Sequence, residues 1–460
     1  MRRIISSLMQ PATTMGLLLL DAGWLAHISP DAGTTPLTGD AMGDRDSLLY
    51  EPGYGLLIED AVIRSVAPSE ELLDEHAPSA KLAAGGVPTS LGQHSGHEVF
   101  DLAGRAVVPG LVDAHTHLLW AGDRSHEASL RRQGYSYRQI SEMGGGIAFT
   151  VRCTREATQA ELVSEGERRL RLAMDHGTTF IEAKSGYGLD TESELALLKA
   201  ADTLANSKTS PPMRHTWLGA HATPPAKEGD GRTEERRRAA YVDEMLAEQL
   251  PAVLEQGIAD SVDVFCEPGW FTLAETEDVC RAGVDGGLQV RLHVDEFEEG
   301  GGAALAAELG ARTADHVAWS DAEGRASCAR AGTLQGFLPG TPHVLGSDHW
   351  PPIRECLENN WPWTLASDFN PNCDSLSLPF SANLAVTRCG VDPLEALVAC
   401  TRNAASGMDH PRGLQTGTLR PGATASLNIL ATDQVDGWCQ TSGESPFIAT
   451  LVEGRWHHSL

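Results

Sequence analysis

The feature that most constrains the fold of this 460-residue chain is an alternation of short apolar runs with helical stretches across its middle. Helical patterns such as Glu161–Asp175 and Ala303–Leu309 separate the apolar runs, an order typical of βα units around a parallel sheet. Eight runs qualify as strands, which predicts an α/β fold, a (β/α)₈ barrel of the TIM type. The predicted strands are Val107–His117, Thr178–Lys184, Arg214–His221, Ser261–Glu267, Leu288–Val294, Ala314–Val317, Thr333–Leu338 and Trp363–Asp368.

The two ends of the chain show short strand candidates between loops instead. These candidates are Leu17–Leu20, Trp24–Ile28, Gly55–Ile63, Leu427–Leu430 and Phe447–Val452. We expect residues 1–105 and 415–460 to pair into one small composite β domain beside a barrel formed by residues 106–414. Residues 30–45 and 77–98 lack a sustained period and are rich in Gly, Asp, Ser and Pro, so we expect loop insertions or partial disorder there.

The charge balance and the cysteines indicate the setting of the protein. Acidic residues outnumber basic ones by 63 to 35, which disfavours nucleic-acid binding because no basic stripe offsets the repulsion from phosphate. Few of the basic residues are lysines, and an acid-rich, lysine-poor surface suits high salt. The 9 cysteines form no Cys-x-x-Cys pair, which favours free thiols in a reducing compartment.

No apolar run reaches the roughly 20 residues of a membrane span. The basic start lacks a signal-peptide pattern and is interpreted as an extension ahead of the first strand. We therefore expect a halophilic, cytoplasmic protein that binds a small-molecule substrate, with a homodimer as an open alternative.

Titratable side chains gather at the ends of the predicted strands, where the active site of such a barrel is built. His115 and His117 end the first strand, and their i, i+2 spacing places both imidazoles on one face of an extended segment. His293 and Asp368 lie at the ends of the fifth and eighth strands. Three imidazoles and one carboxylate suit zinc or iron, with an open position for a water whose pKa would fall to about 7. Asp348 is a weaker candidate than Asp368 because no strand precedes it.

Three further strand-end residues are candidates for proton transfer and support. Glu296, three residues after His293, is predicted to move a proton from the water to the leaving nitrogen. His316 is expected to hydrogen-bond the water or to orient Asp368, and a purely structural role is an alternative. Lys184 opens another alternative, a carboxylated lysine that bridges two metal ions.

Several phrases together resemble the imidazolonepropionase family of metal-dependent amidohydrolases, over roughly residues 108–405. The phrases include Pro109–His117, Ala121–Arg124, Gly144–Ile147, Lys184–Leu189, Gly219–Ala222, Asp263–Glu267 and Ser367–Pro371. The His-x-His pair is shared by the whole superfamily, whereas the combination of the lysine phrase with the triple glycine is far more specific.

The resemblance implies roles that spacing alone leaves open. It implies that Arg124 binds a propionate carboxylate, that Tyr187, His221 and Glu296 contact substrate, and that His221 also polarises the ring carbonyl. It implies further contacts from Asn370 and, more weakly, from Asn372 and Cys373, where relatives commonly carry Gly and then Ser or Thr. The triple glycine Gly144–Gly146 is expected to form a mobile loop over the pocket, or a simple turn.

The implied reaction is hydrolysis of 4-imidazolone-5-propanoate to N-formimidoyl-L-glutamate in histidine degradation, with metal-bound hydroxide attacking the ring amide carbonyl. The nearest alternative is a mononuclear deaminase of the cytosine or guanine type, which shares the same metal ligands. A non-catalytic scaffold derived from the fold is disfavoured, because all four predicted ligands are present.

Overall fold

A computed structural model of the chain describes residues 16–458 except 32, 84, 85, 136–138, 141, 142, 227 and 228. The predicted extension at residues 1–15 lies outside this part of the chain. None of the described helices is long and apolar enough to cross a membrane.

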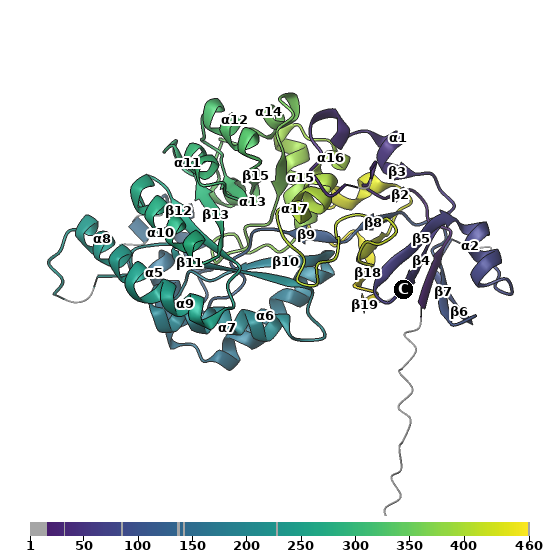
Figure 1. Cartoon of the computed structure of the whole chain (residues 1–460), viewed down its shortest axis with the longest axis horizontal. Helices are drawn as coiled ribbons and strands as arrows, with labels where there is room; N and C mark the ends of the chain where they lie inside the picture. Colours follow the sequence, from purple (N-terminus) through teal and green to yellow (C-terminus); the bar gives the residue numbers. More distant parts are fainter. Residues whose placement is uncertain are drawn as a thin grey trace, which may run out of the picture.

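Eight parallel strands form one sheet in chain order, and helices cover its outside (Figure 1). The predicted (β/α)₈ barrel is therefore confirmed. Its strands are β9 (Leu111–Asp113), β10 (Thr178–Lys184), β11 (Met213–Ala220), β12 (Ser261–Cys266), β13 (Gln289–Val294), β14 (Thr313–His316), β15 (Leu334–Phe337) and β16 (Trp363–Leu365).

The helices begin where the sequence supplies a cap. Thr158 and Thr272 each form a reciprocal capping box with the glutamate three residues later, at the starts of α6 (Gln159–Asp175) and α10 (Leu273–Asp285). The helices that follow the barrel strands are α3 (Glu127–Arg132), α5 (Gly146–Glu156), α6 (Gln159–Asp175), α7 (Thr191–Ala205), α8 (Glu234–Glu244), α9 (Leu250–Gln256), α10 (Leu273–Asp285), α11 (Gly302–Glu308), α12 (Ala322–Ala331), α13 (Gly340–Leu345), α14 (Ile353–Glu358), α15 (Leu378–Cys389), α16 (Pro393–Val398) and α17 (Ala404–Ser406). Two π-helical turns, η2 (Met245–Gln249) and η3 (Ala399–Asn403), join neighbouring helices.

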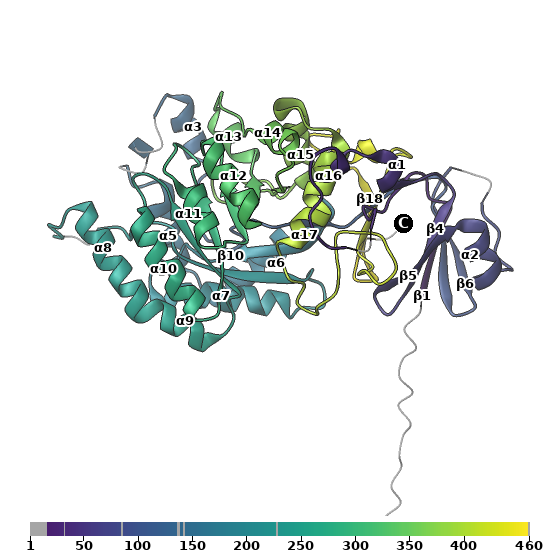
Figure 2. The same ribbon diagram turned by 45° about the horizontal axis from the view of Figure 1, so that its top comes forward.

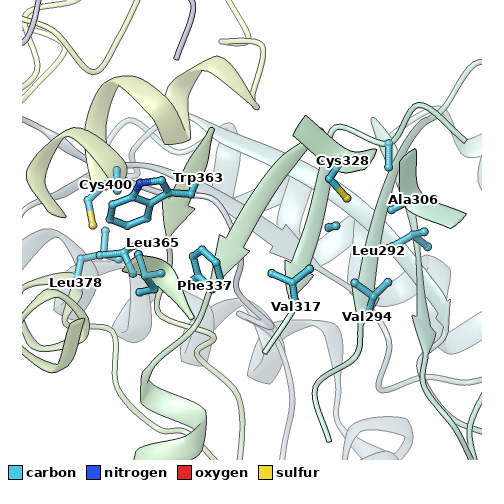
Figure 3. Packing of buried hydrophobic residues seen from close by; sticks show 14 of the residues in the cluster. Leu292, Val294, Ala306, Val317, Cys328, Phe337, Trp363, Leu365, Leu378 and Cys400 are labelled. Atoms are coloured by element: carbon cyan, nitrogen blue, oxygen red, sulfur yellow. The ribbon is translucent and has the colours of Figure 1, made fainter. Parts of the chain in front are cut away.

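Alternation along each strand separates the apolar core from the interior of the barrel. Leu292 and Val294 of β13 pack in one buried cluster with Ala306 of α11 and Cys328 of α12, as Figure 3 shows. Because successive side chains of a strand point to opposite faces, His293 between them faces into the barrel. The same alternation therefore builds the core outside the sheet and delivers polar groups to its interior.

The first predicted strand is split in two. β8 (Val107–Pro109) pairs with β17 (Leu427–Leu430) and β2 (Leu25–Ala26) outside the barrel, and only β9 enters the eight-stranded sheet. Gly110 permits the change of sheet, because a Cβ there would lie 2.1 Å from Thr179 Oγ1. His115 and His117 follow β9 in an extended segment rather than ending one long strand.

The chain ends form two further sheets at one end of the barrel (Figure 2). The sheet of N-terminal strands has the order β5-β4-β1-β7-β6, and the sheet that combines both ends has the order β19-β18-β17-β8-β2-β3. Their elements are β1 (Gly16–Leu20), β2 (Leu25–Ala26), η1 (Gly39–Met42), α1 (Arg45–Leu48), β3 (Leu49–Tyr50), β4 (Tyr54–Glu59), β5 (Val62–Pro68), α2 (Ser69–His76), β6 (Thr89–His94), β7 (His97–Asp101), β17 (Leu427–Leu430), η4 (Val435–Cys439), β18 (Phe447–Val452) and β19 (Arg455–His458).

Several expectations for the N-terminal region are corrected. The described part of residues 77–88 is a loop, as expected, whereas residues 89–98 form β6 and the start of β7, which pair as a hairpin. Ser95 and Gly96 form the turn of this hairpin, with φ of 49° and 91°. The hairpin was not predicted because β6 is an exposed edge strand with a polar sequence. Residues 55–63 also contain a turn, at Asp60 and Ala61, between β4 and β5.

The described part of residues 30–45 is an ordered loop rather than a disordered one. Leu37 and Met42 are buried, and the backbone of Leu37 exchanges hydrogen bonds with the Asn403 side chain. Asn403 also donates to the carbonyl of Trp363, so the loop is fastened to the barrel behind β16.

Candidate active site and metal centre

The predicted metal ligands meet at the seam where the barrel closes. Thr116 and Phe369 form a parallel bridge just beyond β9 and β16. The Asp368 N–H donates to the carbonyl of His115 at 3.2 Å, and the His117 N–H donates to the carbonyl of Phe369 at 2.8 Å. Backbone pairing of the first and last strands therefore places His115, His117 and Asp368 side by side.

The donor atoms of four buried side chains converge at this seam. His117 Nε2 lies 3.3 Å from His293 Nε2, and Asp368 Oδ1 lies 3.6 Å from His115 Nε2 and 3.7 Å from His117 Nε2. Ligand atoms around a tetrahedral zinc ion lie about 3.3 Å apart when each bond is about 2.0–2.1 Å. Two imidazole nitrogens that face each other at this distance need a proton or a cation between them. His115, His117 and His293 form one ligand triad, and His115, His316 and Asp368 form a second that shares His115, so the cluster fits a divalent cation.

A carboxylate lies beside the far nitrogen of two of these imidazoles, hydrogen-bonded at His115 and at ion-pair distance at His293. His115 Nδ1 lies 2.8 Å from Asp315 Oδ2, and His293 Nδ1 lies 3.0 Å from Asp263 Oδ2. An imidazole whose Nδ1–H donates a hydrogen bond to a carboxylate keeps the lone pair of Nε2 free for a metal ion. Asp263 and Asp315 are thus suited to orient the ligands.

Lys184 lies inside the barrel among these carboxylates. Its Nζ is 2.8 Å from Asp263 Oδ2 and 3.0 Å from Glu182 Oε1, and none of the three side chains is exposed. Burial opposes the charge of Lys184, but Asp263 and Glu182 raise its pKa above the usual value. Carboxylation needs a neutral amine, so this environment argues against a carboxylated lysine between two metal ions.

Glu296 lies beside the ligand cluster on the loop that follows β13. Its Oε2 is 3.5 Å from His316 Nε2, and its side chain is 13% exposed. Burial, followed by the nearby charges of Asp368 and Glu267, raises the pKa of Glu296 well above its usual value. The backbone N–H of Glu296 donates to Glu267 Oε2 at 2.8 Å, which holds the loop. A largely buried carboxyl of raised pKa next to the cluster is suited to proton transfer.

Three site residues adopt a left-handed backbone conformation that is rare outside glycine. The φ angles are 51° at Asp295, 73° at His316 and 50° at Asp368. Each lies where a strand gives way to its loop, and Asp295 accepts hydrogen bonds from the backbone N–H groups of Gly300 and Gly302. Strained backbone of this kind concentrates at functional sites.

His221 and Tyr187 form the wall beside His117. The His221 ring stacks on His117 with centroids 4.9 Å apart, and the Tyr187 ring lies 5.0 Å from His221. His221 Nδ1 lies 2.9 Å from the carbonyl of Gly186, which can only accept, so Nδ1 carries the proton. Burial, followed by His293, lowers the pKa of His221 to about 3, so Nε2 is an acceptor at neutral pH. This tautomer departs from the expected polarisation of the ring carbonyl by His221, because a neutral acceptor cannot donate to an oxyanion.

Arg124 is found in a buried ion pair that the sequence did not indicate. Its Nε and Nη2 donate to the two carboxylate oxygens of Glu127, each at 2.9 Å. Arg131 lies 3.7 Å from the same carboxylate and donates to Asn372 Oδ1 at 2.8 Å. Two guanidinium groups share this one carboxylate. Asn372, from the loop after Asp368, is joined to it through Arg131.

The remaining predicted residues of this loop are engaged by the loop itself. Asn370 donates to the carbonyl of Asp368 and accepts from the backbone N–H groups of Asn372 and Cys373. The Cys373 thiol is buried 3.8 Å from the carbonyl of Ser367. Both side chains therefore support the backbone around Asp368, which differs from the expected direct contacts with substrate.

The triple glycine lies at the start of α5. Gly144 and Gly146 have φ of 88° and 64°, and the Gly146 N–H donates to Glu127 Oε1 at 2.8 Å. Glu127 thereby links the glycine segment to Arg124.

A cavity of about 190 Å³ opens beside Glu296 and His316. Its outer wall includes the Trp319 indole, which stacks on His349 with centroids 3.7 Å apart. Asp348, the rejected alternative to Asp368, is exposed in the same loop and lies outside the ligand cluster.

The supporting residues Glu127, Glu182, Asp263 and Asp315 were missed from the sequence. The signal for Asp263 was a carboxylate inside a mostly apolar strand, since such a group needs a buried partner, whereas Asp315 was overlooked beside His316 in a short polar run. No comparable signal marks Glu127, which lies in an ordinary polar stretch.

Comparison with known proteins identifies close relatives. No family model matches the chain. An imidazolonepropionase of Haloarcula marismortui is 39% identical over 395 residues, covering 86% of this chain and 87% of that protein. One of Symbiobacterium thermophilum is 39% identical over 426 residues, covering 90% and 91% of the two chains. One of Shewanella pealeana is 42% identical over 357 residues, covering 76% and 84%.

Solved structures share the fold at much lower identity. A 5-methylcytosine deaminase of Klebsiella pneumoniae superposes with a TM-score of 0.63 at 15% identity, over 96% of this chain and 97% of that one. An ochratoxinase of A. niger gives a TM-score of 0.61 at 16% identity, over 96% and 95%.

Proposed function

Because this chain belongs to the imidazolonepropionase family, within the amidohydrolase superfamily, we propose that it hydrolyses 4-imidazolone-5-propanoate. The product is N-formimidoyl-L-glutamate, and the reaction is a ring-opening step of histidine degradation. Identity of 39–42% over most of the chain carries this conclusion. The deaminase alternative is less well supported, because the deaminase comparison at 15% identity concerns the fold alone.

We propose that His115, His117, His293 and Asp368 hold one divalent cation, zinc or iron. The separations of 3.3–3.7 Å among their donor atoms support this ligand set, as does the chemistry of three imidazoles and one carboxylate. When bound, such a cation acidifies water and polarises the substrate carbonyl. Asp263 and Asp315 keep two imidazoles in the tautomer that presents Nε2 to the site.

Glu296 moves the proton in this mechanism. Its carboxylate takes a proton from the attacking water as the new C–O bond forms. It then gives that proton to the ring nitrogen as the C–N bond breaks. The raised pKa of Glu296 makes its protonated form a competent acid after the first step. His316, 3.5 Å away, keeps the carboxyl beside the ligand cluster.

The remaining side chains bind and orient substrate. His221 Nε2 accepts a hydrogen bond from an N–H of the substrate ring, since its Nδ1–H donates to the carbonyl of Gly186. Tyr187 packs beside His221 and provides an apolar surface for the substrate ring. Arg124, fixed in orientation by Glu127, provides the positive charge for the propionate, and Arg131 with Asn372 extends that charged surface.

Glu296→Gln tests the proposed proton transfer. The variant keeps the shape of the side chain but removes the base, so we expect turnover to fall about 10²- to 10⁴-fold with metal content unchanged. Loss of imidazolonepropionate absorbance measures turnover, and elemental analysis measures the metal. Glu298→Gln, an exposed neighbour on the same loop, is the matched control. Wild-type turnover by Glu296→Gln would remove this residue from the mechanism, and activity on cytosine or guanine instead would overturn the substrate assignment.

We also propose a cytoplasmic, high-salt setting with no nucleic-acid or membrane partner and with a homodimer as the assembly to test. All nine cysteines are free thiols, seven of them buried, as suits a reducing compartment. The net charge of −28 suits concentrated salt, which screens the repulsion.

A further inference from the structure

A second group of side chains with metal-ligand chemistry lies between helix α6 and strand β19. It consists of Asp175, the last residue of α6, and of His457 and His458 at the end of β19. Asp175 precedes β10, whose far end carries Lys184 at the catalytic cluster. A strand of 7 residues spans about 23 Å, so the two groups lie at opposite ends of the barrel.

The three side chains converge at one point. His457 Nε2 lies 2.8 Å from Asp175 Oδ1, and the two imidazole rings have centroids 5.3 Å apart. One ligand atom from each residue lies within 4.8 Å of the other two. His458 Nδ1 is buried and has no hydrogen-bond partner among the described residues. His458 therefore has at least one ring nitrogen that the described protein groups leave without a hydrogen bond.

The local electrostatic field favours a cation. Asp175 ends a 17-residue helix, and the unpaired carbonyl groups at the C-terminus of a helix carry a partial negative charge. The chain as a whole has a net charge of −28, which concentrates cations at its surface.

We infer that Asp175, His457 and His458 form a second metal site, selective for a divalent transition ion such as zinc. Two imidazoles and one carboxylate match zinc, copper or nickel, whereas magnesium and calcium prefer oxygen ligands alone. Three protein ligands leave one tetrahedral position for water. Zinc binding requires side-chain movements that open the 2.8 Å contact between Asp175 and His457 to roughly 3.3 Å and that bring the His458 nitrogen, now within 4.8 Å of both, to the same separation.

Such an ion would join two parts of the molecule. α6 belongs to the helical layer of the barrel, whereas β19 is the edge strand of the sheet formed by both chain ends. The site would therefore fasten the last strand to the barrel without contact with the catalytic cluster.

Zinc titration of tag-free holoenzyme tests this inference. With the barrel metal in place, we expect one further molar equivalent of zinc to bind and to raise the midpoint of thermal unfolding. His457→Ala, His458→Ala and Asp175→Asn should each lose that equivalent and the thermal shift, with turnover and the barrel metal retained. His76→Ala is the matched control, because His76 pairs with one carboxylate, Glu75, at 3.8 Å.

Two results would overturn the site. One is holoenzyme that binds no further zinc, and the other is a further equivalent that all three variants retain. Loss of the equivalent in His76→Ala as well would show non-specific surface binding and would equally refute it. Cobalt in place of zinc gives an independent readout, because tetrahedral coordination by the histidines produces visible absorption that the variants must lack.

Discussion

Replacement of Asp315 by asparagine tests whether the carboxylates behind the imidazoles set the strength of metal binding. Asp315 Oδ2 lies 2.8 Å from His115 Nδ1, and both side chains are at most 4% exposed. Asparagine keeps the size of the side chain and an acceptor oxygen, but it removes the negative charge. The imidazole then loses basicity, and its tautomer is held less firmly.

The size of the effect follows from the burial of this pair. A hydrogen bond to a charged group is worth about 1.5–3 kcal/mol, which corresponds to a factor of about 10–100 in an equilibrium constant. Loss of a carboxylate behind a metal-bound histidine costs about the same factor in metal affinity. We therefore expect the dissociation constant for zinc to rise about 10- to 100-fold in Asp315→Asn, with turnover largely restored at saturating zinc.

The assay is competition for zinc between the protein and a chromophoric chelator, followed by turnover at increasing zinc. Asp321→Asn is the matched control, because Asp321 caps α12 near the same strand and asparagine caps a helix equally well. The reasoning is refuted if Asp315→Asn binds zinc as tightly as the wild type. It is also refuted if both variants weaken binding equally.

Three further predictions follow from buried charge, a buried histidine and net charge. Lys184→Met leaves Asp263 and Glu182 without their shared cation, so the free energy of unfolding in denaturant should fall by about 3–5 kcal/mol; an unchanged value contradicts the proposed ion network. Burial lowers the pKa of His27 to about 4 in the folded protein, whereas the unfolded chain keeps the usual value near 6.5. Between these pH values the unfolded chain binds one more proton than the folded protein, so the free energy of unfolding decreases as the pH falls, by at most about 3 kcal/mol. His27→Asn should remove that part of the pH dependence in unfolding experiments, and an unaltered pH profile would show that His27 is not its source. The net charge of −28 predicts that KCl raises the midpoint of thermal unfolding more than sucrose of equal osmolality does, whereas full stability in dilute buffer would contradict adaptation to salt.

Much of the barrel could be predicted because local pattern determines it. A strand that is buried on both sides consists almost entirely of apolar residues, and an amphipathic helix shows one apolar face. Apolar runs that alternate with amphipathic stretches therefore predict the strands and helices of the barrel. β6 and β7 were not predicted from the sequence, because β6 is a polar edge strand that is stabilised by its pairing with β7 and not by an apolar face of its own. β8 was not predicted as a separate strand because its three apolar residues continue almost directly into β9. Only tertiary packing decides which sheet β8 and β9 each join.

The sequence by itself determined the kinds of side chain at each strand end, and therefore the candidate ligands His115, His117, His293 and Asp368. Only the tertiary structure decided their distances, because these depend on the backbone pairing of segments about 250 residues apart at the barrel seam. It also decided their partners: Asp315 behind His115, Glu127 beside Arg124, and the proton on His221. A hydrogen bond between side chains depends on positions in space, and neither composition nor spacing along the chain contains that information.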